Sequence, residues 1–146
     1  MNLIQDAHQE LKGFTILVVE DNELNQMVAQ GLLEYNGASV AIANHGKEAL
    51  EILRNETIDC VLMDIQMPVM DGLEATQMIR ANAQWADLLI IAVTANADHQ
   101  YKDLCRSVGM NDFLTKPINP ELLVNTLLKW LAPEQDSKAR VDDSNR

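Results

Sequence analysis

The chain has 146 residues, of which 47% are hydrophobic and 4% aromatic, and it carries a formal net charge of −11. This length and apolar content fit a single domain built around one core. The negative charge and the scarcity of aromatic side chains disfavour direct nucleic-acid binding, which needs Lys and Arg for phosphates and aromatic rings for stacking.

Apolar runs and helical patterns alternate along the chain. Short apolar runs, as expected of strands covered on both faces, occupy 14–19, 40–43, 60–63, 88–93 and 112–114. Helical apolar spacing occupies 24–35, 46–54, 72–80, 98–108 and 119–131. Five such alternations predict an α/β fold, a doubly wound five-stranded parallel sheet of order 2-1-3-4-5 with helices on both faces.

The two ends of the chain differ from the part between them. Residues 1–13 are predicted to be a linker or N-terminal arm, 14–132 the domain, and 133–146 a disordered tail. Cys60 and Cys105 are expected to pack in the core without forming a disulfide framework, which indicates a reducing compartment and a cytoplasmic location. No apolar run reaches transmembrane length, so we expect no membrane contact by this chain.

The stretch from Val61 to Gly72 organises the rest of the sequence. Its apolar run ends in Asp64, Pro68 prevents the strand from continuing, and Asp71 followed by Gly72 indicates a turn and a helix start. Asp64 is therefore predicted at the carboxyl end of a strand, the edge at which open α/β sheets bind ligands.

Three other predicted strands also end in polar residues. Glu20 and Asp21 follow the first strand, Thr94 follows the fourth, and Lys116 comes shortly after the fifth. Because the carboxyl ends of parallel strands meet at one edge of the sheet, we expect these side chains to converge on Asp64.

The predicted cluster has the chemistry of phosphoryl transfer onto a carboxylate. Three carboxylates in one place repel one another unless a cation neutralises them, and Mg²⁺ prefers such hard oxygen ligands. Lys116 would supply a compact positive charge for a phosphate oxygen, and Thr94 a hydroxyl donor. The sequence contains neither GxGxxG nor GxxxxGK[ST], the glycine-rich phosphate loops.

Four stretches at these strand ends carry a family resemblance. They are Ile16-Leu17-Val18-Val19-Glu20-Asp21-Asn22, Val61-Leu62-Met63-Asp64 through Asp71-Gly72, Ala92-Val93-Thr94-Ala95, and Phe113-Leu114-Thr115-Lys116-Pro117. Together they resemble the response-regulator receiver domain of two-component signalling over about residues 14–132. The wording at 19–26 and 64–72 resembles receivers attached to hybrid sensor histidine kinases.

The resemblance implies a flavodoxin-like receiver fold with Mg²⁺ as cofactor. Asp64 would be the phosphoacceptor and would take a phosphoryl group from phosphohistidine. Asp21 and Asp64 would bind Mg²⁺ directly, together with the backbone carbonyl of Gln66. Glu20 would act mainly through metal-bound water.

The resemblance also assigns the residues that sense the phosphate. Thr94 and Lys116 would hold phosphate oxygens, and Lys116 would precede a cis Pro117. Phe113 would occupy the aromatic switch position, where it lacks a hydroxyl and could act by packing alone. The face formed by 98–131 would then switch between two arrangements.

The implied partners are a histidine kinase or a histidine phosphotransfer domain, with a downstream protein or a homodimer on the 98–131 face. The domain's own chemistry would be self-phosphotransfer and self-dephosphorylation. We predict a receiver that belongs to, or is partnered with, a hybrid sensor histidine kinase. The alternative is a free-standing single-domain regulator that acts by protein docking.

Two other functions fit parts of the sequence. A phosphatase of the haloacid-dehalogenase type also uses a strand-end Asp, but it needs a second Asp where this chain has Gln66. A degenerate receiver used only for docking would lack an acid, Thr94 or Lys116, and none is missing here. Taken singly, Glu20 and Asp21 could be helix N-terminal acids and Lys116 a solvated lysine, so the prediction depends on their convergence.

Overall fold

The computed structural model describes residues 9–67, 69–96 and 98–133. Pro68 and most of the two predicted terminal segments therefore lie outside the described residues. The strands are β1 Thr15–Val19, β2 Ser39–Ala43, β3 Cys60–Asp64, β4 Leu89–Thr94 and β5 Asp112–Thr115. The helices are α2 Glu23–Tyr35, α3 Gly46–Asn55, α4 Gly72–Arg80, the short 3₁₀ helix η1 Ala83–Trp85, α5 His99–Ser107 and α6 Pro120–Leu131.

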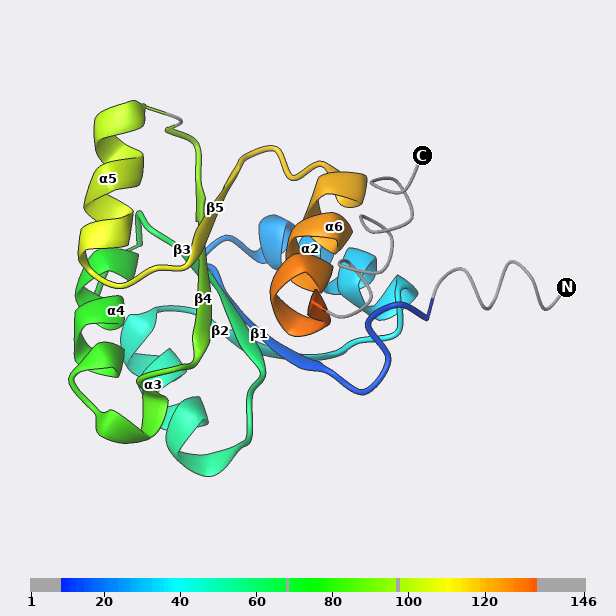
Figure 1. Cartoon of the computed structure of the whole chain (residues 1–146), viewed down its shortest axis with the longest axis horizontal. Coiled ribbons are helices and arrows are strands. Elements are labelled where there is room, and N and C mark those ends of the chain that lie inside the picture. The colour runs from blue at the N-terminus through cyan, green and yellow to red at the C-terminus, as the bar shows by residue number, and fades with distance from the viewer. Residues whose placement is uncertain (1–8, 68, 97, 134–146) are drawn as a thin grey trace, which may run out of the picture.

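The sheet has the predicted topology. Its five strands are all parallel and lie in the order β2-β1-β3-β4-β5. In Figure 1, α3, α4 and α5 cover one face of the sheet while α2 and α6 cover the other. Because β1 and β3 are the inner strands at which the connections change direction, their carboxyl ends form the crevice where such sheets bind ligands.

Two apolar clusters, one on each face, hold the layers together. The cluster on the α3, α4 and α5 side contains inward-facing strand residues such as Leu17, Val61 and Ile90. The cluster on the α2 and α6 side contains the alternate residues, including Ile16, Leu62 and Ile91. Successive strand side chains point to opposite faces, so a strand buried on both faces reads as a continuous apolar run.

The helix ends follow local sequence signals. Asp71 and Asn119 cap α4 and α6 by accepting hydrogen bonds from backbone N–H groups in the first turn. Gly37 and Gly109, which follow α2 and α5, have positive φ angles of 99° and 107°, which glycine adopts without strain.

Four features differ from what the apolar pattern of the sequence suggests. The apolar spacing on α2 does not mark its buried face, because Ala29 and Leu33 are buried while Leu24 and Met27 are 67% and 63% exposed. Leu104 on α5, an apolar residue of the helical spacing at 98–108, is 44% exposed because the helix turns Cys105 inward.

The other differences concern the loop 82–87 and residues 9–13. The loop, which is polar in sequence apart from Trp85, contains η1, which packs Trp85 against the core until only 8% of it is exposed. Leu11, within the predicted arm, is fully buried, and its N–H donates to the carbonyl of Asn36 over 2.8 Å. The packed core therefore extends back to Leu11, while the division of the whole chain into segments stays a prediction.

Candidate phosphoacceptor and metal site

Parallel pairing of β1 with β3 brings the predicted acids together. Val19 pairs with Met63, so Glu20, Asp21 and Asp64 follow one another across the carboxyl edge of the sheet. The three carboxylates each place an oxygen within 4.8 Å of the other two. Glu20 and Asp64 are buried, whereas Asp21 is exposed, so the cluster opens to solvent on the Asp21 side.

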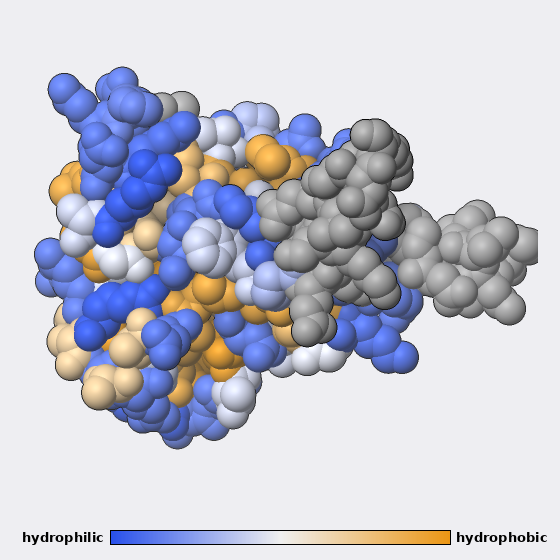
Figure 2. Space-filling model, viewed as in Figure 1, coloured by the Kyte–Doolittle hydropathy of each residue, from blue (hydrophilic) through white to orange (hydrophobic). Residues whose placement is uncertain are grey.

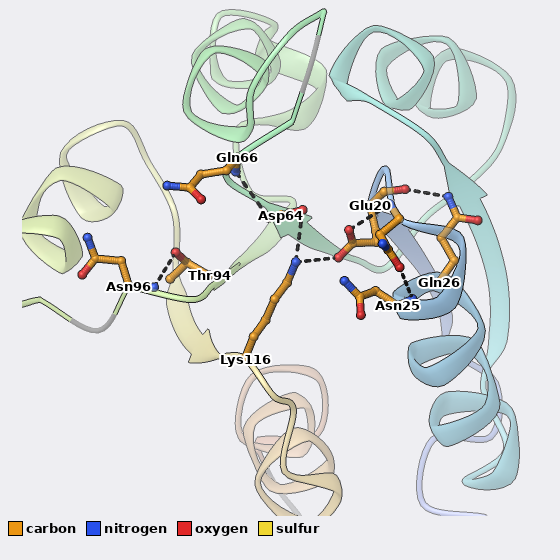
Figure 3. Close-up of polar contacts among 9 residues, drawn as sticks. Glu20, Asn25, Gln26, Asp64, Gln66, Thr94, Asn96 and Lys116 are labelled. Atoms are coloured by element: carbon orange, nitrogen blue, oxygen red, sulfur yellow. Dashed lines mark hydrogen bonds and ion pairs between the residues drawn. The ribbon is translucent and has the colours of Figure 1, made fainter.

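Lys116 reaches this cluster from the loop after β5. Its Nζ lies 2.8 Å from Glu20 Oε1 and 3.2 Å from Asp64 Oδ2 (Figure 3). Its backbone N–H donates to the carbonyl of Thr94 over 2.8 Å, and its bond to Pro117 is cis, as the resemblance implies. The lysine that the sequence places 52 residues from Asp64 is thus its direct ion-pair partner.

The environment separates the proton affinities of the two buried acids. Burial, together with the nearby Glu20 carboxylate, raises the pKa of Asp64 to about 6, although Lys116 opposes the shift. Burial also acts to raise the pKa of Glu20, but hydrogen bonds from Lys116 and from the Asn22 N–H outweigh it, so that pKa is lowered. The same two acids raise the pKa of Lys116 against the effect of its own burial.

Thr94 and Gln66 flank Asp64 on the side away from Glu20 (Figure 3). Thr94 is buried, and its Oγ1 accepts the N–H of Asn96 over 3.1 Å, which leaves its hydroxyl hydrogen able to donate elsewhere. The N–H of Gln66 donates to Asp64 Oδ1 over 3.3 Å. The structure therefore brings together all the residues predicted to contact a phosphate or a metal ion.

Phe113 lies on β5, the strand that pairs with β4, and β4 ends at Thr94. It is half-buried, and Lys102 of α5 places its Nζ 5.0 Å from the centre of the ring. Ala92, two residues before Thr94, pairs with Phe113 across β4 and β5. The predicted switch residue thus lies on the strand next to the one that carries Thr94, and its role stays a prediction.

Sequence reasoning assigned no role to the following contacts. A side chain at Gly72 would clash with the carbonyl oxygen of Asp64, so only glycine lets α4 begin this close to the end of β3. Gln26 donates from Nε2 to the carbonyl oxygen of Glu20 over 2.6 Å. Apolar spacing alone cannot identify such contacts, because they depend on loops that are distant in sequence.

The donor set fits a magnesium ion. Carboxylates are hard oxygen ligands, and Mg²⁺ takes one or two of them while keeping several water molecules. One exposed acid beside two buried ones leaves room for those waters. Lys116 neutralises part of the negative charge, and the remainder favours a cation.

A model of the response regulator receiver domain family matches residues 16–128. The chain belongs to this family. It is 41% identical over 140 residues to "Hybrid signal transduction histidine kinase I" of Dictyostelium discoideum, a match that covers 88% of this chain and 8% of that protein. It is 40% identical over 134 residues to "Sensor protein GacS" of Pseudomonas syringae pv. syringae, covering 85% of this chain and 15% of that protein. This receiver thus spans only a small part of these relatives' length.

Solved receivers share the fold. The receiver domain of sensor histidine kinase PA1611 from Pseudomonas aeruginosa, whose structure holds a magnesium ion in the active site cleft, matches with a TM-score of 0.76 and 39% identity, covering 82% of this chain and 98% of that one. The co-crystal structure of Saccharomyces cerevisiae Ypd1 with the Ssk1 receiver domain matches with a TM-score of 0.79 and 29% identity, covering 85% and 92%. Within the described part of this receiver, no helix combines the length and hydropathy needed to span a membrane.

Proposed function

We propose that this receiver is a phosphoacceptor in a phosphorelay and that Asp64 takes a phosphoryl group from phosphohistidine in the presence of Mg²⁺. The observation that carries the proposal is the position of Lys116 Nζ, 2.8 Å from Glu20 and 3.2 Å from Asp64 at the open carboxyl edge of the sheet. A cation held there can bind a phosphate oxygen as soon as Asp64 carries one.

The transfer exchanges one bond to phosphorus for another. A carboxylate oxygen of Asp64 attacks phosphorus while the P–N bond breaks, and the imidazole nitrogen keeps the electron pair and takes up a proton. Lys116 pairs with one phosphate oxygen, and the Thr94 hydroxyl donates to another. In self-dephosphorylation, water attacks the same phosphorus and frees Asp64.

Glu20, Asp21, Asp64 and the carbonyl of Gln66 are the groups that would hold Mg²⁺. When bound, the ion supplies neutralisation of the charge on the transferred group. Glu20 is already bound to Lys116 and the Asn22 N–H, so we assign direct ligation to Asp21 and Asp64 and water-mediated contact to Glu20.

The partner would be a helix that carries the phosphohistidine. The start of α2, next to the site, exposes Leu24, Met27 and Val28, which are 67%, 63% and 49% accessible. An apolar strip beside a polar reactive centre is typical of a docking surface for an amphipathic helix. The Ypd1–Ssk1 complex supports a histidine phosphotransfer protein as such a partner.

The acceptor is tested with a small phosphodonor, with and without Mg²⁺, on the wild-type protein and Asp64→Asn. We expect a base-labile acyl phosphate only in the wild type and only with Mg²⁺. Asp103→Asn, an exposed carboxylate on α5, is the matched control and should label normally. Label that persists in Asp64→Asn would show that another residue is the acceptor.

The parent protein would be a hybrid sensor histidine kinase, as the relatives' names support. The alternative remains a free-standing regulator, since a putative response regulator from Chloroflexus aurantiacus and the Vibrio cholerae chemotaxis protein CheY4 match over 99% and 98% of their own chains. Phosphorylated receiver should pass its label to a histidine phosphotransfer protein within minutes. Label that is retained with every such protein, together with altered binding to another target, would favour the free-standing regulator.

A further inference from the structure

Gln26 of α2 contacts the loop after β1, as Figure 3 shows, and it also contacts the loop after β2. Its Nε2 donates to the carbonyl oxygen of Glu20 over 2.6 Å and to Asn44 Oδ1 over 2.8 Å. Asn44 in turn donates from Nδ2 to Glu48 Oε1 over 2.9 Å. These contacts form one chain that runs from the metal-site loop through α2 to the first turns of α3.

The chemistry of the chain gives each amide one orientation. The carboxylate of Glu48 only accepts hydrogen bonds, so Asn44 must present its NH₂ group to Glu48 and its oxygen to Gln26. Gln26 must then present its NH₂ group to Asn44, which also directs it to the Glu20 carbonyl. Two acceptors therefore share one two-hydrogen donor, an arrangement that other uncharged side chains of this length do not reproduce.

This chain of hydrogen bonds acts on the loop that carries Asp21, the exposed acid of the cluster. The N–H of Glu20 donates to the carbonyl of Ala43 over 3.0 Å, and its own carbonyl accepts from Gln26. Both peptide groups that flank Glu20 are thereby held against the β2 side of the sheet. Because the Asp21 side chain is exposed, its distance from Asp64 is set through this backbone.

We propose that Gln26 is a positioning residue for the metal site: by tying the Glu20 carbonyl to Asn44, it holds Asp21 at the separation from Asp64 that one shared Mg²⁺ requires. This proposal rests on the proposed Mg²⁺-dependent function. Gln26 itself touches neither the ion nor the phosphate and acts through the loop.

Gln30 provides a matched comparison one turn further along α2. Its Nε2 donates to Glu34 Oε2 over 3.1 Å, a contact within the same helix that reaches no loop. Gln30→Met and Gln26→Met therefore remove the same amide group from the same helix, but only the second releases Glu20. Gln26→Arg keeps N–H donors for the Glu20 carbonyl and is the conservative rescue variant.

The experiment measures the Mg²⁺ dissociation constant of the metal-free protein by NMR titration of the Asp21 and Gln66 amides, alongside urea unfolding without metal. We expect Gln26→Met to raise Kd about fivefold, the effect of losing one hydrogen bond. Gln26→Arg should recover most of the affinity, and Gln30→Met should match the wild type. Adding Asn44→Ala to Gln26→Met should raise Kd no further, because both changes break one chain.

Each other result contradicts the proposal in a recognisable way. An unchanged Kd in Gln26→Met, with or without a loss of stability, would reduce Gln26 to a structural contact. An equal rise in Gln30→Met would show a general effect of α2. A wild-type protein that binds no Mg²⁺ would reject the proposed metal function, and the positioning role with it.

Discussion

Lys116 neutralises less charge than Glu20, Asp21 and Asp64 bring to the site. The excess is visible in Asp64, whose pKa is raised to about 6 by burial and by the Glu20 carboxylate. A buried carboxylate beside a second one is costly, and this cost is what a bound cation removes. The proposed nucleophile is therefore also a residue that destabilises the metal-free fold when it is ionised.

Asp64→Asn should consequently stabilise the metal-free protein at neutral pH. The folded-state pKa of about 6 exceeds the ordinary value of 3.8, so proton binding favours the fold. That stabilisation is fully present below pH 3.8 and is lost as the pH rises through 6. The variant should therefore gain on the order of 2 kcal/mol over the wild type at pH 7.5 and little at pH 4.

Urea unfolding without metal, across that pH range, measures the difference. Asp103→Asn, the exposed control on α5, should follow the wild type at every pH. Adding Mg²⁺ should reduce the difference in unfolding free energy between Asp64→Asn and the wild type, because the ion binds the wild-type carboxylates and stabilises that protein by mass action. An Asn variant that is less stable than the wild type at pH 7.5 would contradict this prediction.

The helix α2 carries two faces with different tasks. Ala29 and Leu33 bury one face against the sheet, while Leu24, Met27 and Val28 leave an apolar strip exposed beside the site. A strip that contributed only to folding would be buried, so its exposure next to Asp64 supports the proposed docking surface.

Met27→Lys should test this strip. We expect phosphotransfer from a histidine phosphotransfer protein to slow about tenfold or more, because a charge replaces an apolar contact. Labelling by a small phosphodonor should be unchanged, since Asp64 and Lys116 are untouched. Leu104→Lys, an exposed leucine on α5 across the sheet, is the matched control. Equal slowing with both donors would mean that the substitution damages the site rather than docking.

The other end of the sheet depends on a guanidinium in α4. Arg80 donates from Nε to the carbonyl of Gly109 over 3.0 Å and from Nη1 to that of Trp85 over 2.8 Å. Its Nη2 donates to Asn111 Oδ1 over 2.9 Å. One side chain thus joins α4 to η1 and to the turn before β5, using the fixed fork geometry of arginine.

Arg80→Leu should lower the free energy of unfolding by about 2–3 kcal/mol, because it leaves partly buried carbonyls without donors. Arg54→Leu removes the corresponding last-turn cation of α3, which is exposed, and should cost less than about 0.5 kcal/mol. Urea unfolding of both variants checks this. Similar losses of unfolding free energy in the two variants would show that the helix dipole, rather than the guanidinium hydrogen bonds of Arg80, accounts for the effect.

The face formed by 98–131, which is predicted to switch, contains α5, β5 and α6. Figure 2 views the face where α5, β5 and α6 meet, and hydrophobic atoms lie exposed there between hydrophilic side chains. Asp112 of β5 accepts the indole N–H of Trp130 over 2.7 Å and lies 3.6 Å from Lys129 Nζ. If movement of Thr94 and Phe113 shifts β5, the environment of Trp130 must therefore change.

Beryllofluoride, a mimic of the acyl phosphate, should reveal this coupling. With Mg²⁺ present we expect the Trp130 indole N–H resonance to shift, while that of Trp85 stays constant because Trp85 is part of η1, next to the Arg80 contacts. Asp64→Asn should abolish the Trp130 shift. Shifts confined to the residues around Asp64 would reject the idea that phosphate is sensed on this face.

The sequence alone predicted the five parallel strands, their order and the positions of Asp64, Thr94 and Lys116 at strand ends. It could do so because continuous apolar runs mark buried strands, and because parallel strands must all end at the same edge. The cis bond before Pro117 was also expected, from the family resemblance, and is present.

Tertiary structure alone decided which face of α2 is buried, why position 72 must be glycine, and how Gln26 reaches Glu20 and Asn44. Periodicity locates a helix but not its partner, because an exposed apolar strip and a buried one have the same spacing. Contacts between loops form or fail with differences of a few tenths of an ångström in the distance between residues that are far apart in sequence. Only packing of the complete domain sets those distances, and with them the charge balance at Asp64.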